Sequence, residues 1–306
     1  GACSLLLVEP DGELRSINSC LALVQSMAGR EIRSVEGIAS GETLHPAQSA
    51  MVSCNGSQCG YCTPGFIASM VEGCHRKSPL SEDEIADQLC GNLCRCTGYR
   101  PIREAMQQAL DQRDELAAWS ASHAPGKVEV APVESLLDDG VFLRPETIEQ
   151  ALMFKSSHPE AVFIAGATEL AVLINKRHVR YPALISLDRI AALHEILETP
   201  DAWHIGAAAR LTDVETTLKG KYPALDSMFR WFASRQIRHR ATLGGNLVTA
   251  SPIGDSAPVL LALDASVVLV SHEGERIVRL SEFFTGYRKT VMAADELMKA
   301  ILIPHE

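Results

Sequence analysis

Four cysteines in two short runs constrain this chain more than any other feature. Cys59 and Cys62 form a C-x-x-C, and Cys94 and Cys96 form a C-x-C. Thiolates at such spacings ligate zinc or an iron–sulfur cluster, although disulfides or buried free thiols are also compatible. The C-x-C favours a [2Fe-2S] unit, because two ligands one residue apart crowd a single tetrahedral ion. The spacing predicts a sulfur-ligated centre and leaves its metal open.

Each cysteine run precedes a stretch with helix-start signals. Thr63 is placed to cap a helix with Pro64 at its first position, and Thr97 is placed to cap one that runs from Pro101. Two helix N-termini facing each other would direct backbone N–H groups and positive dipole ends at the four sulfurs. Such groups lower thiol pKa values, so the arrangement suits an anionic metal centre.

The composition excludes several classes of protein. A length of 306 residues is enough for about two domains, and 46% hydrophobic residues supply their cores. The 28 Lys and Arg against 38 Asp and Glu give a formal charge of −10, which argues against nucleic acid or an anionic membrane as partner. No apolar run approaches the ~18 residues of a membrane span. Nine clustered cysteines favour metal ligands in a reducing, cytoplasmic compartment over a secreted disulfide scaffold.

Hydrophobic patterning divides the chain into four regions. They are short strands and one helix over 1–41, four helices over 42–118, a linker over 119–140, and alternating strands and helices over 141–306. The alternation in the last region indicates an α/β or α+β domain. Three cysteines outside the two runs, Cys54, Cys74 and Cys90, are expected in the core, because an unpaired cysteine behaves as a small hydrophobe.

Two glycine-containing turns in the last region are candidates for cofactor binding. The apolar strand ending at Ala165 runs into Gly166 and then a helix, and bare backbone N–H groups at such a turn can meet a pyrophosphate. Further on, Gly244 and Gly245 permit close approach of a ligand to the backbone. A plain structural turn is the alternative in both places.

Side chains around the second turn could complete a site for a flat, hydroxyl-bearing cofactor. Thr242 and Asn246 supply hydrogen bonds, Asp255 supplies an acceptor for ribityl or ribose hydroxyls, and Phe232 could stack on a ring. The alternatives are a capping Asp and a core aromatic residue. A basic group between these positions, Arg235, Arg238, His239 and Arg240, is expected to be a solvated helix end, with a phosphate site as the alternative.

Residues 58–66 and 91–102 resemble the helical [2Fe-2S] domain of the molybdenum hydroxylases, the family of xanthine dehydrogenase, aldehyde oxidase and carbon monoxide dehydrogenase. The resemblance implies that the four cysteines hold the cluster nearer the molybdenum cofactor. It also implies that Gln58 contacts the pterin in another domain or subunit. Residues 1–3 and 17–21 resemble the end of a plant-type ferredoxin (β-grasp) domain, so that Cys3 and Cys20 match two ligands of a first [2Fe-2S] cluster. Two ordinary thiols are the alternative there.

Residues 141–306 resemble the FAD domain of the same family. The implied contacts with the diphosphate are Phe163, Ile164, Ala165, Gly166, Ala167, Thr168, Glu169 and Leu170. The other implied FAD contacts are Phe232, Thr242, Gly244, Gly245, Asn246, Asp255 and Met298. The family's first two plant-type ligands and its C-terminal FAD subdomain have no counterpart, so the chain is expected to be truncated at both ends.

The predicted fold class is therefore α+β multidomain: a ferredoxin remnant, a four-helix [2Fe-2S] domain and an α/β FAD-binding domain. The resemblance implies an electron-transfer subunit that receives electrons from molybdopterin on a large partner subunit. It passes them through two [2Fe-2S] clusters and FAD to NAD+, within a higher heteromer and with no catalytic residue of its own. A related hydroxylase acting on an aldehyde, carbon monoxide or an N-heterocycle, a non-catalytic electron carrier, and a zinc-stapled structural protein remain alternatives.

Overall fold

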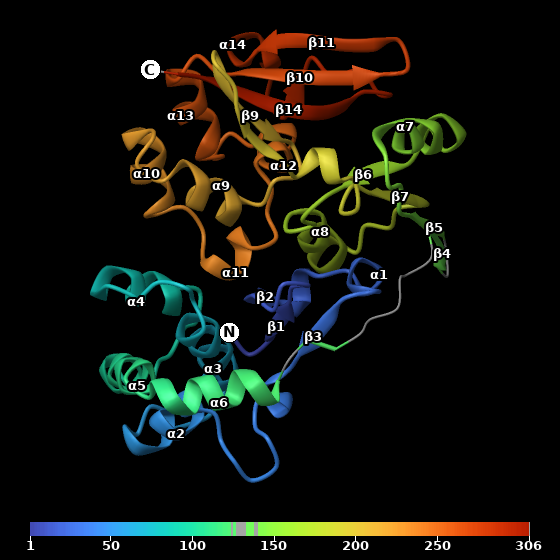
Figure 1. Ribbon diagram of the computed structural model, residues 1–306. Coiled ribbons are helices and arrows are strands. Elements are labelled where there is room, and N and C mark those ends of the chain that lie inside the picture. Colours follow the sequence, from blue (N-terminus) through green and yellow to red (C-terminus); the bar gives the residue numbers. More distant parts are fainter. Residues whose placement is uncertain (124, 127–132, 138–139, 306) are drawn as a thin grey trace. The chain divides into compact units, whose positions relative to one another are not determined.

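A computed structural model describes residues 1–123, 125–126, 133–137 and 140–305. The chain forms two compact units, each made of two segments (Figure 1). The first unit contains Gly1–Ala131 and Ala233–His239, and the second contains Pro132–Phe232 and Arg240–Glu306. A short piece from the second half of the chain thus belongs to the first unit. In the described part of the chain, no helix is long and apolar enough to cross a membrane.

The first unit begins with a three-stranded antiparallel sheet. Its strands are β1 (Ser4–Val8), β2 (Leu14–Asn18) and β3 (Glu31–Arg33), in the order β2-β1-β3. Short helical turns follow the strands, namely η1 (Ser19–Leu21), α1 (Val24–Met27) and η2 (Val35–Gly37). Apolar side chains of β1 and β2 enter the core, where Leu6 and Ile17 are fully buried.

Four helices then form where the sequence predicts them. They are α2 (Pro46–Ser53), α3 (Thr63–Cys74), α4 (Glu82–Leu89) and α5 (Arg100–Leu110). Helix α3 is central, because it packs against β1, β2, α2, α4 and α5 and is buried at every position from Gly65 to Gly73. A helix buried on all sides needs buried hydrogen-bond partners for its polar side chains. In α3 these polar side chains are Ser69 and Glu72.

A fifth helix, α6 (Arg113–Ser122), runs into the predicted linker. Trp119 explains the difference, because its side chain is buried and its indole N–H donates to the Ile38 carbonyl oxygen at 2.7 Å. Ser and Ala at 120–122 have linker composition but continue the helix. Residues 134–137 of the predicted linker form a strand, and positions 124, 127–132 and 138–139 lie outside the described residues.

The second unit contains two main sheets. One has the order β4-β5-β7-β6, from β4 (Glu134–Leu137), β5 (Gly140–Leu143), β6 (Val162–Ile164) and β7 (Ala183–Ser186). Strands β5, β7 and β6 are parallel, and α7 (Ile148–Ser157) and α8 (Leu170–Arg177) connect them as βαβ units require. The other sheet is antiparallel, in the order β11-β10-β14-β9-β8.

The five antiparallel strands are β8 (Ile196–Glu198), β9 (Ala202–Gly206), β10 (Ser266–Ser271), β11 (Gly274–Arg279) and β14 (Leu297–Pro304). The remaining elements of this unit are η3 (Ala191–Leu193), α9 (Leu211–Leu218), α10 (Pro223–Phe229), α12 (Leu243–Val248), α13 (Ser256–Ala262), α14 (Leu280–Phe283) and the hairpin β12 (Phe284–Gly286)–β13 (Lys289–Thr290). One large apolar core lies between these helices and the antiparallel sheet (Figure 1).

Candidate metal centre and cofactor-binding loops

The four cysteines of the two runs lie together as two pairs in the first unit. The thiols of Cys59 and Cys96 lie close enough to shift each other's pKa, and so do the thiols of Cys62 and Cys94. Cys62 is the N-cap of α3 and is buried, whereas Cys59 and Cys96 are exposed. The local fold thus brings two runs more than 30 residues apart to one place.

The predicted caps differ from the observed ones. Thr63 is the first residue of α3 rather than its cap, and its hydroxyl lies 2.7 Å from that of Ser57. Helix α5 starts at Arg100 after Tyr99, whose φ is 69°, and no side chain caps it. Thr97 instead hydrogen-bonds the Cys94 thiol at 3.2 Å, and its hydroxyl accepts from the Tyr99 N–H. Thr97 therefore hydrogen-bonds a predicted metal ligand instead of capping α5.

Within each pair, one thiol has a lowered pKa and the other a raised pKa. The hydrogen bond with Thr97 is the main cause that lowers the pKa of Cys94 to about 7, while burial, with Cys94 beside it, raises the pKa of Cys62 to about 11. The Tyr61 backbone and then the Cys96 thiol lower the pKa of Cys59, and the hydrogen bond with Cys59 raises the pKa of Cys96. Each pair therefore favours one thiolate.

The paired arrangement suits one of the metal centres that the spacing leaves open. A [2Fe-2S] unit takes four thiolates spread over two irons, and four cysteines that lie together as two pairs match that requirement. Among the residues that the structure describes, no three His, Cys, Asp or Glu side chains are grouped to hold a single metal ion.

The two cysteines expected to belong to a first cluster also lie together. The Sγ atoms of Cys3 and Cys20 are 3.3 Å apart, and the Asn18 side-chain amide lies 3.7 Å from the Cys3 sulfur. Burial opposes ionisation of Cys3, but the hydrogen bonds with Cys20 outweigh it and lower the pKa of Cys3. The structure thus brings these thiols close enough to share one metal unit.

Exposed side chains surround the four-cysteine site. Gln58, predicted to contact the pterin, is exposed beside Cys59. Tyr61 and Leu93 are 78% and 82% exposed, so each run has a large, solvent-exposed hydrophobic side chain next to its cysteines. Of the three cysteines expected in the core, Cys54 and Cys74 pack partly against it, but Cys90 is exposed, because it lies at the end of α4.

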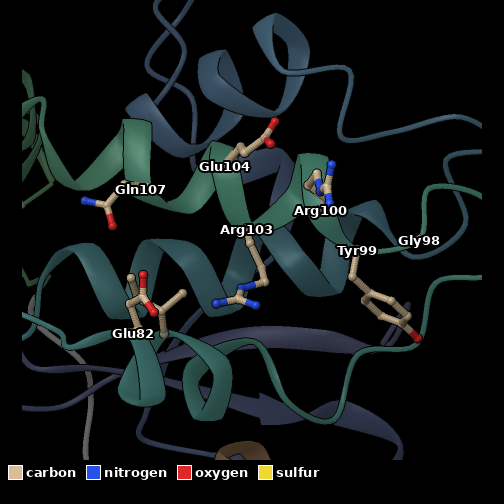
Figure 2. A pocket seen from close by; sticks show the side chains of 8 residues that line it. Glu82, Gly98, Tyr99, Arg100, Arg103, Glu104 and Gln107 are labelled. Carbon is tan, nitrogen blue, oxygen red and sulfur yellow. The ribbon is translucent and has the colours of Figure 1, made fainter.

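A cavity of about 480 Å³ opens between α4 and α5. It is lined by Glu82, Ile85, Gly98, Tyr99, Arg100, Arg103, Glu104 and Gln107. Figure 2 shows Arg103 reaching from α5 toward the helix that carries Glu82. None of the predicted cysteine ligands lines this cavity, and charges of both signs meet in it.

The basic group at 235–240 is not a solvated helix end, contrary to the prediction. Arg235, Arg238, His239 and Arg240 are all buried, with exposures of 8%, 0%, 0% and 5%. Helix α11 (Arg235–Arg238) belongs to the first unit, where Arg235 and His239 bind Glu72 and Arg238 binds Asp87. The acidic partners come from helices some 150 residues earlier, so local composition gives no sign of them.

In the second unit, β6 ends in the first predicted FAD loop. Gly166 has no room for a side chain, because a Cβ there would approach the Arg240 carbonyl oxygen to 1.8 Å. Ala167 follows with φ 63°, a left-handed conformation that is unusual for alanine. Turns that contain a left-handed residue can direct successive N–H groups at one point, which is how backbone binds anions. Thr168, Glu169 and Leu170 then enter α8 half-buried.

The second predicted FAD loop lies against the first. The Thr242 hydroxyl caps α12 by accepting from the Gly245 N–H at 3.1 Å, and Gly244 packs directly on Ala207. The Asn246 side chain accepts a hydrogen bond from the Ser256 hydroxyl. Because Gly166 touches the backbone at Arg240 and Ala241, the two loops are neighbours.

Three further predicted FAD contacts lie around these loops. Asp255 is exposed at the start of α13, and Phe232 is half-buried against the apolar core. Met298 is buried in β14, opposite Leu269, and α12 packs against the same strand. Their contacts with FAD remain predictions.

The left-handed alanine gives a stability test of the first loop. We expect Ala167→Gly to raise the free energy of unfolding by up to about 1 kcal/mol, because glycine adopts positive φ without a Cβ clash. Ala151→Gly in α7, also buried but helical, should lower it by about 1 kcal/mol or more. Denaturant unfolding of both variants measures the difference. Equal losses in the two variants would show that the backbone at 167 is unstrained.

Comparison with known proteins identifies the two units. Residues 34–107 match the family described as [2Fe-2S] binding domain, and residues 135–306 match the family described as FAD binding domain in molybdopterin dehydrogenase. These matches define an iron–sulfur flavoprotein. The chain belongs to the molybdenum hydroxylase family and carries its [2Fe-2S] and FAD-binding domains. The predicted fold class and the predicted cofactors [2Fe-2S] and FAD are confirmed at this level.

Similar sequences cover the whole chain. It is 30% identical to xanthine dehydrogenase/oxidase of Rattus norvegicus over 362 residues, covering 100% of this chain and 27% of the relative. It is 32% identical to xanthine dehydrogenase of Drosophila pseudoobscura pseudoobscura, covering 98% and 27%. The chain therefore spans about a quarter of the length of these curated relatives.

Solved structures match about half of the chain. A carbon monoxide dehydrogenase from Hydrogenophaga pseudoflava that lacks the Mo-pyranopterin moiety aligns with a TM-score of 0.52 and 26% identity, over 54% of this chain and 58% of that chain. Quinoline 2-oxidoreductase from Pseudomonas putida 86 aligns with the same TM-score and identity, over 54% and 59%.

Proposed function

We propose that this chain is the electron-transfer component of a xanthine dehydrogenase-like enzyme. It takes electrons from a molybdenum cofactor on a partner subunit and carries them by two [2Fe-2S] clusters and FAD to NAD+. The oxidation served would be that of hypoxanthine and xanthine to urate in purine catabolism. The observation that carries the proposal is the two-plus-two arrangement of cysteines on a chain that also has the FAD-binding domain. Full-length similarity to xanthine dehydrogenases supports the choice of enzyme.

The chain's residues would hold and tune the cofactors rather than act on the purine. Cys59, Cys62, Cys94 and Cys96 would hold one [2Fe-2S] unit, which supplies one-electron redox chemistry when bound. The Thr97 hydroxyl, which hydrogen-bonds the Cys94 sulfur at 3.2 Å, would raise the reduction potential by stabilising negative charge on that sulfur. Cys3 and Cys20 would supply two ligands of the other cluster.

The partner would be a large subunit that carries molybdopterin, assembled with this chain into a higher heteromer. Gln58 beside Cys59 would contact the pterin. Tyr61 and Leu93 support a partner surface here, because large apolar side chains are costly to leave in water. We place the complex in the cytoplasm, since an odd number of clustered cysteines suits a reducing compartment.

A second candidate function rests on the structural comparisons. Solved relatives include a carbon monoxide dehydrogenase and a quinoline oxidoreductase, so the substrate of the partner could be a small gas or an N-heterocycle. Assay of the intact complex with xanthine, quinoline and carbon monoxide separates these options. Reduction of bound FAD by NADH distinguishes a dehydrogenase from an electron carrier that does not use NAD+.

Removal of one sulfur tests the metal centre. We expect Cys94→Ser to abolish most of the iron, sulfide and visible absorption of the second cluster, because a cluster left with three of its four thiolates is bound weakly. Cys90→Ser, four residues away and exposed, is the matched control and should leave all three unchanged. Metal and sulfide quantitation with the visible spectrum makes the measurement. One zinc per chain in a colourless protein would contradict the proposal.

A further inference from the structure

Arg240 lies between the two loops predicted to bind FAD. Its carbonyl oxygen packs against Gly166 in the first loop, and two residues later Thr242 caps α12 in the second. The predicted FAD contacts do not include this arginine, although a phosphate site is the alternative that the sequence leaves open for its basic group. Its backbone nevertheless touches one loop and leads directly into the other.

The guanidinium of Arg240 is buried without enough acceptors. The side chain is 5% exposed, and among the described residues its Nε and Nη2 atoms are buried and have no hydrogen-bond partner. The Asp188 carboxylate lies 3.6 Å from Nη2, which is an ion-pair distance but too long for a hydrogen bond. The ion pair with Asp188 supplies charge but no hydrogen bond, and buried N–H groups without an acceptor cost free energy, so their position indicates an anionic ligand.

The position of the Arg240 guanidinium near the edge of the parallel sheet agrees with an anionic ligand. Asp188 follows β7, and the Leu187 N–H donates to the Ile164 carbonyl oxygen at the end of β6. The carboxyl ends of two parallel neighbours therefore meet beside Arg240. In open α/β sheets, ligands bind outside these ends. The turn at Gly166 and Ala167 offers backbone N–H groups at the same edge.

We propose that Arg240 binds the diphosphate of FAD, together with the backbone N–H groups of the Gly166 turn. Asp188 holds the guanidinium in place when the diphosphate is away, and competes with the diphosphate for the guanidinium. The inference rests on the proposed function, because it concerns the flavin cofactor of that function. It adds a side-chain cation to a site whose predicted contacts include no lysine or arginine.

The test compares ligands that have and lack the diphosphate. Titration calorimetry on the full chain would measure the Kd of FAD, riboflavin and inorganic pyrophosphate. For Arg240→Met we expect a loss of about 10–100-fold in affinity for FAD and pyrophosphate, as for a charged hydrogen bond, and less than about twofold for riboflavin. Arg240→Lys should recover part of the loss. Arg276→Met, which removes an arginine paired with Glu296, is the matched control and should leave all three Kd values unchanged.

The Asp188→Asn variant distinguishes a diphosphate-binding role of Arg240 from a purely structural role. If Arg240 binds the diphosphate, removing the competing carboxylate should tighten FAD binding, whereas a purely structural pair would make this variant bind more weakly. Equal losses of FAD and riboflavin affinity in Arg240→Met, or no loss at all, would overturn the inference and leave the proposed function standing. A wild-type chain that binds neither FAD nor pyrophosphate would overturn both.

Discussion

Replacing Glu72 by glutamine should lower the free energy of unfolding of the first unit by about 3–5 kcal/mol, the usual cost of removing one partner of a buried ion pair. The carboxylate is 2% exposed and accepts five hydrogen bonds. Its Oε1 receives Arg235 Nε and Nη2 at 3.0 Å and His239 Nε2 at 2.8 Å. Its Oε2 receives the Ser16 N–H at 3.0 Å and the Ser16 hydroxyl.

The ionisation of these groups explains the size of the expected loss. Burial alone would raise the pKa of Glu72, but the donors from His239, Arg235 and Ser16 outweigh it and hold the pKa below its usual value. Burial lowers the pKa of His239 despite the adjacent carboxylate, so we assign a neutral imidazole that donates its Nε2–H. A neutral side chain at 72 would therefore remove the charged partner that Arg235 contacts at 3.0 Å, whereas its ion pair with Asp87 is longer, at 3.7 Å.

The measurement is guanidinium unfolding combined with hydrogen exchange of the α3 amides, which reports on the first unit. Arg235→Met should cost a similar amount, and the double variant Glu72→Leu/Arg235→Met should cost clearly less than the sum, because neither charge is then unpaired. Glu275→Gln, which breaks the exposed pair with Lys299, is the control and should change stability by less than about 1 kcal/mol. Additive losses in the double variant would show that Glu72 and Arg235 do not act as a pair.

The second large effect is acid destabilisation through His45 and His75. Their hydrogen bonds form one directed chain: the Ala47 N–H donates to His45 Nδ1 at 2.9 Å, and His45 Nε2 lies 3.0 Å from His75 Nε2. His75 Nδ1 lies 3.0 Å from the Ser120 hydroxyl, which donates to the Leu116 carbonyl oxygen. Since His45 Nδ1 accepts, its proton is on Nε2, and by the same logic the proton of His75 is on Nδ1. Both rings must be neutral.

The surroundings keep these rings neutral. Burial, with His75 and His123 nearby, lowers the pKa of His45 to about 3, and burial with His123 lowers that of His75 to about 4. Trp119 covers the group, with ring centroids 4.8 Å from His75 and 4.1 Å from His123, and Arg33 lies over the same indole. Protonation of either ring would add positive charge to a buried group that already has the Arg33 guanidinium beside it.

The sign of the pH effect follows from the lowered values. In the unfolded chain each histidine binds a proton near pH 6.5, whereas in the folded chain it does so only near pH 3 or 4. The contribution of the two neutral rings to the free energy of unfolding is therefore complete above pH 6.5, and it is lost as the pH falls toward 4. The expected slope is about 1.4 kcal/mol per pH unit for each histidine.

Denaturant midpoints between pH 7 and pH 4.5 measure this slope. His75→Gln should remove about half of it, because one titrating ring is gone. His272→Gln, an exposed histidine of the second unit, should leave it unchanged. Stability that is flat over this range in the wild type would show that the two rings are not buried as neutral groups.

Local signals in the sequence were enough for the helices and loops that carry the candidate cofactor sites. The starts of α3 and α5 and the βα turn after β6 each depend on a few adjacent residues, namely proline and glycine at fixed offsets. The threonine caps predicted for the two helices were wrong, and the FAD contacts assigned within the loops stay predictions. The role of Thr97 could not be predicted, because its hydroxyl could bond either the start of α5 or the Cys94 sulfur. The conformation of the turn between Cys94 and Tyr99 selects the sulfur.

The sequence by itself determined which chemical groups are available, namely four thiols at metal-binding spacing and glycine turns suited to a diphosphate. It also determined the family to which the chain belongs. What only the tertiary structure decided was how buried charges are paired. Arg235 and Glu72 are 163 residues apart, and Arg238 and Asp87 are 151 apart. Charge neutralisation in a low-dielectric interior depends on distance in space, and a sequence records distance along the chain. That is why Arg235, Arg238 and His239, which composition places in water, lie instead in the interior of the first unit.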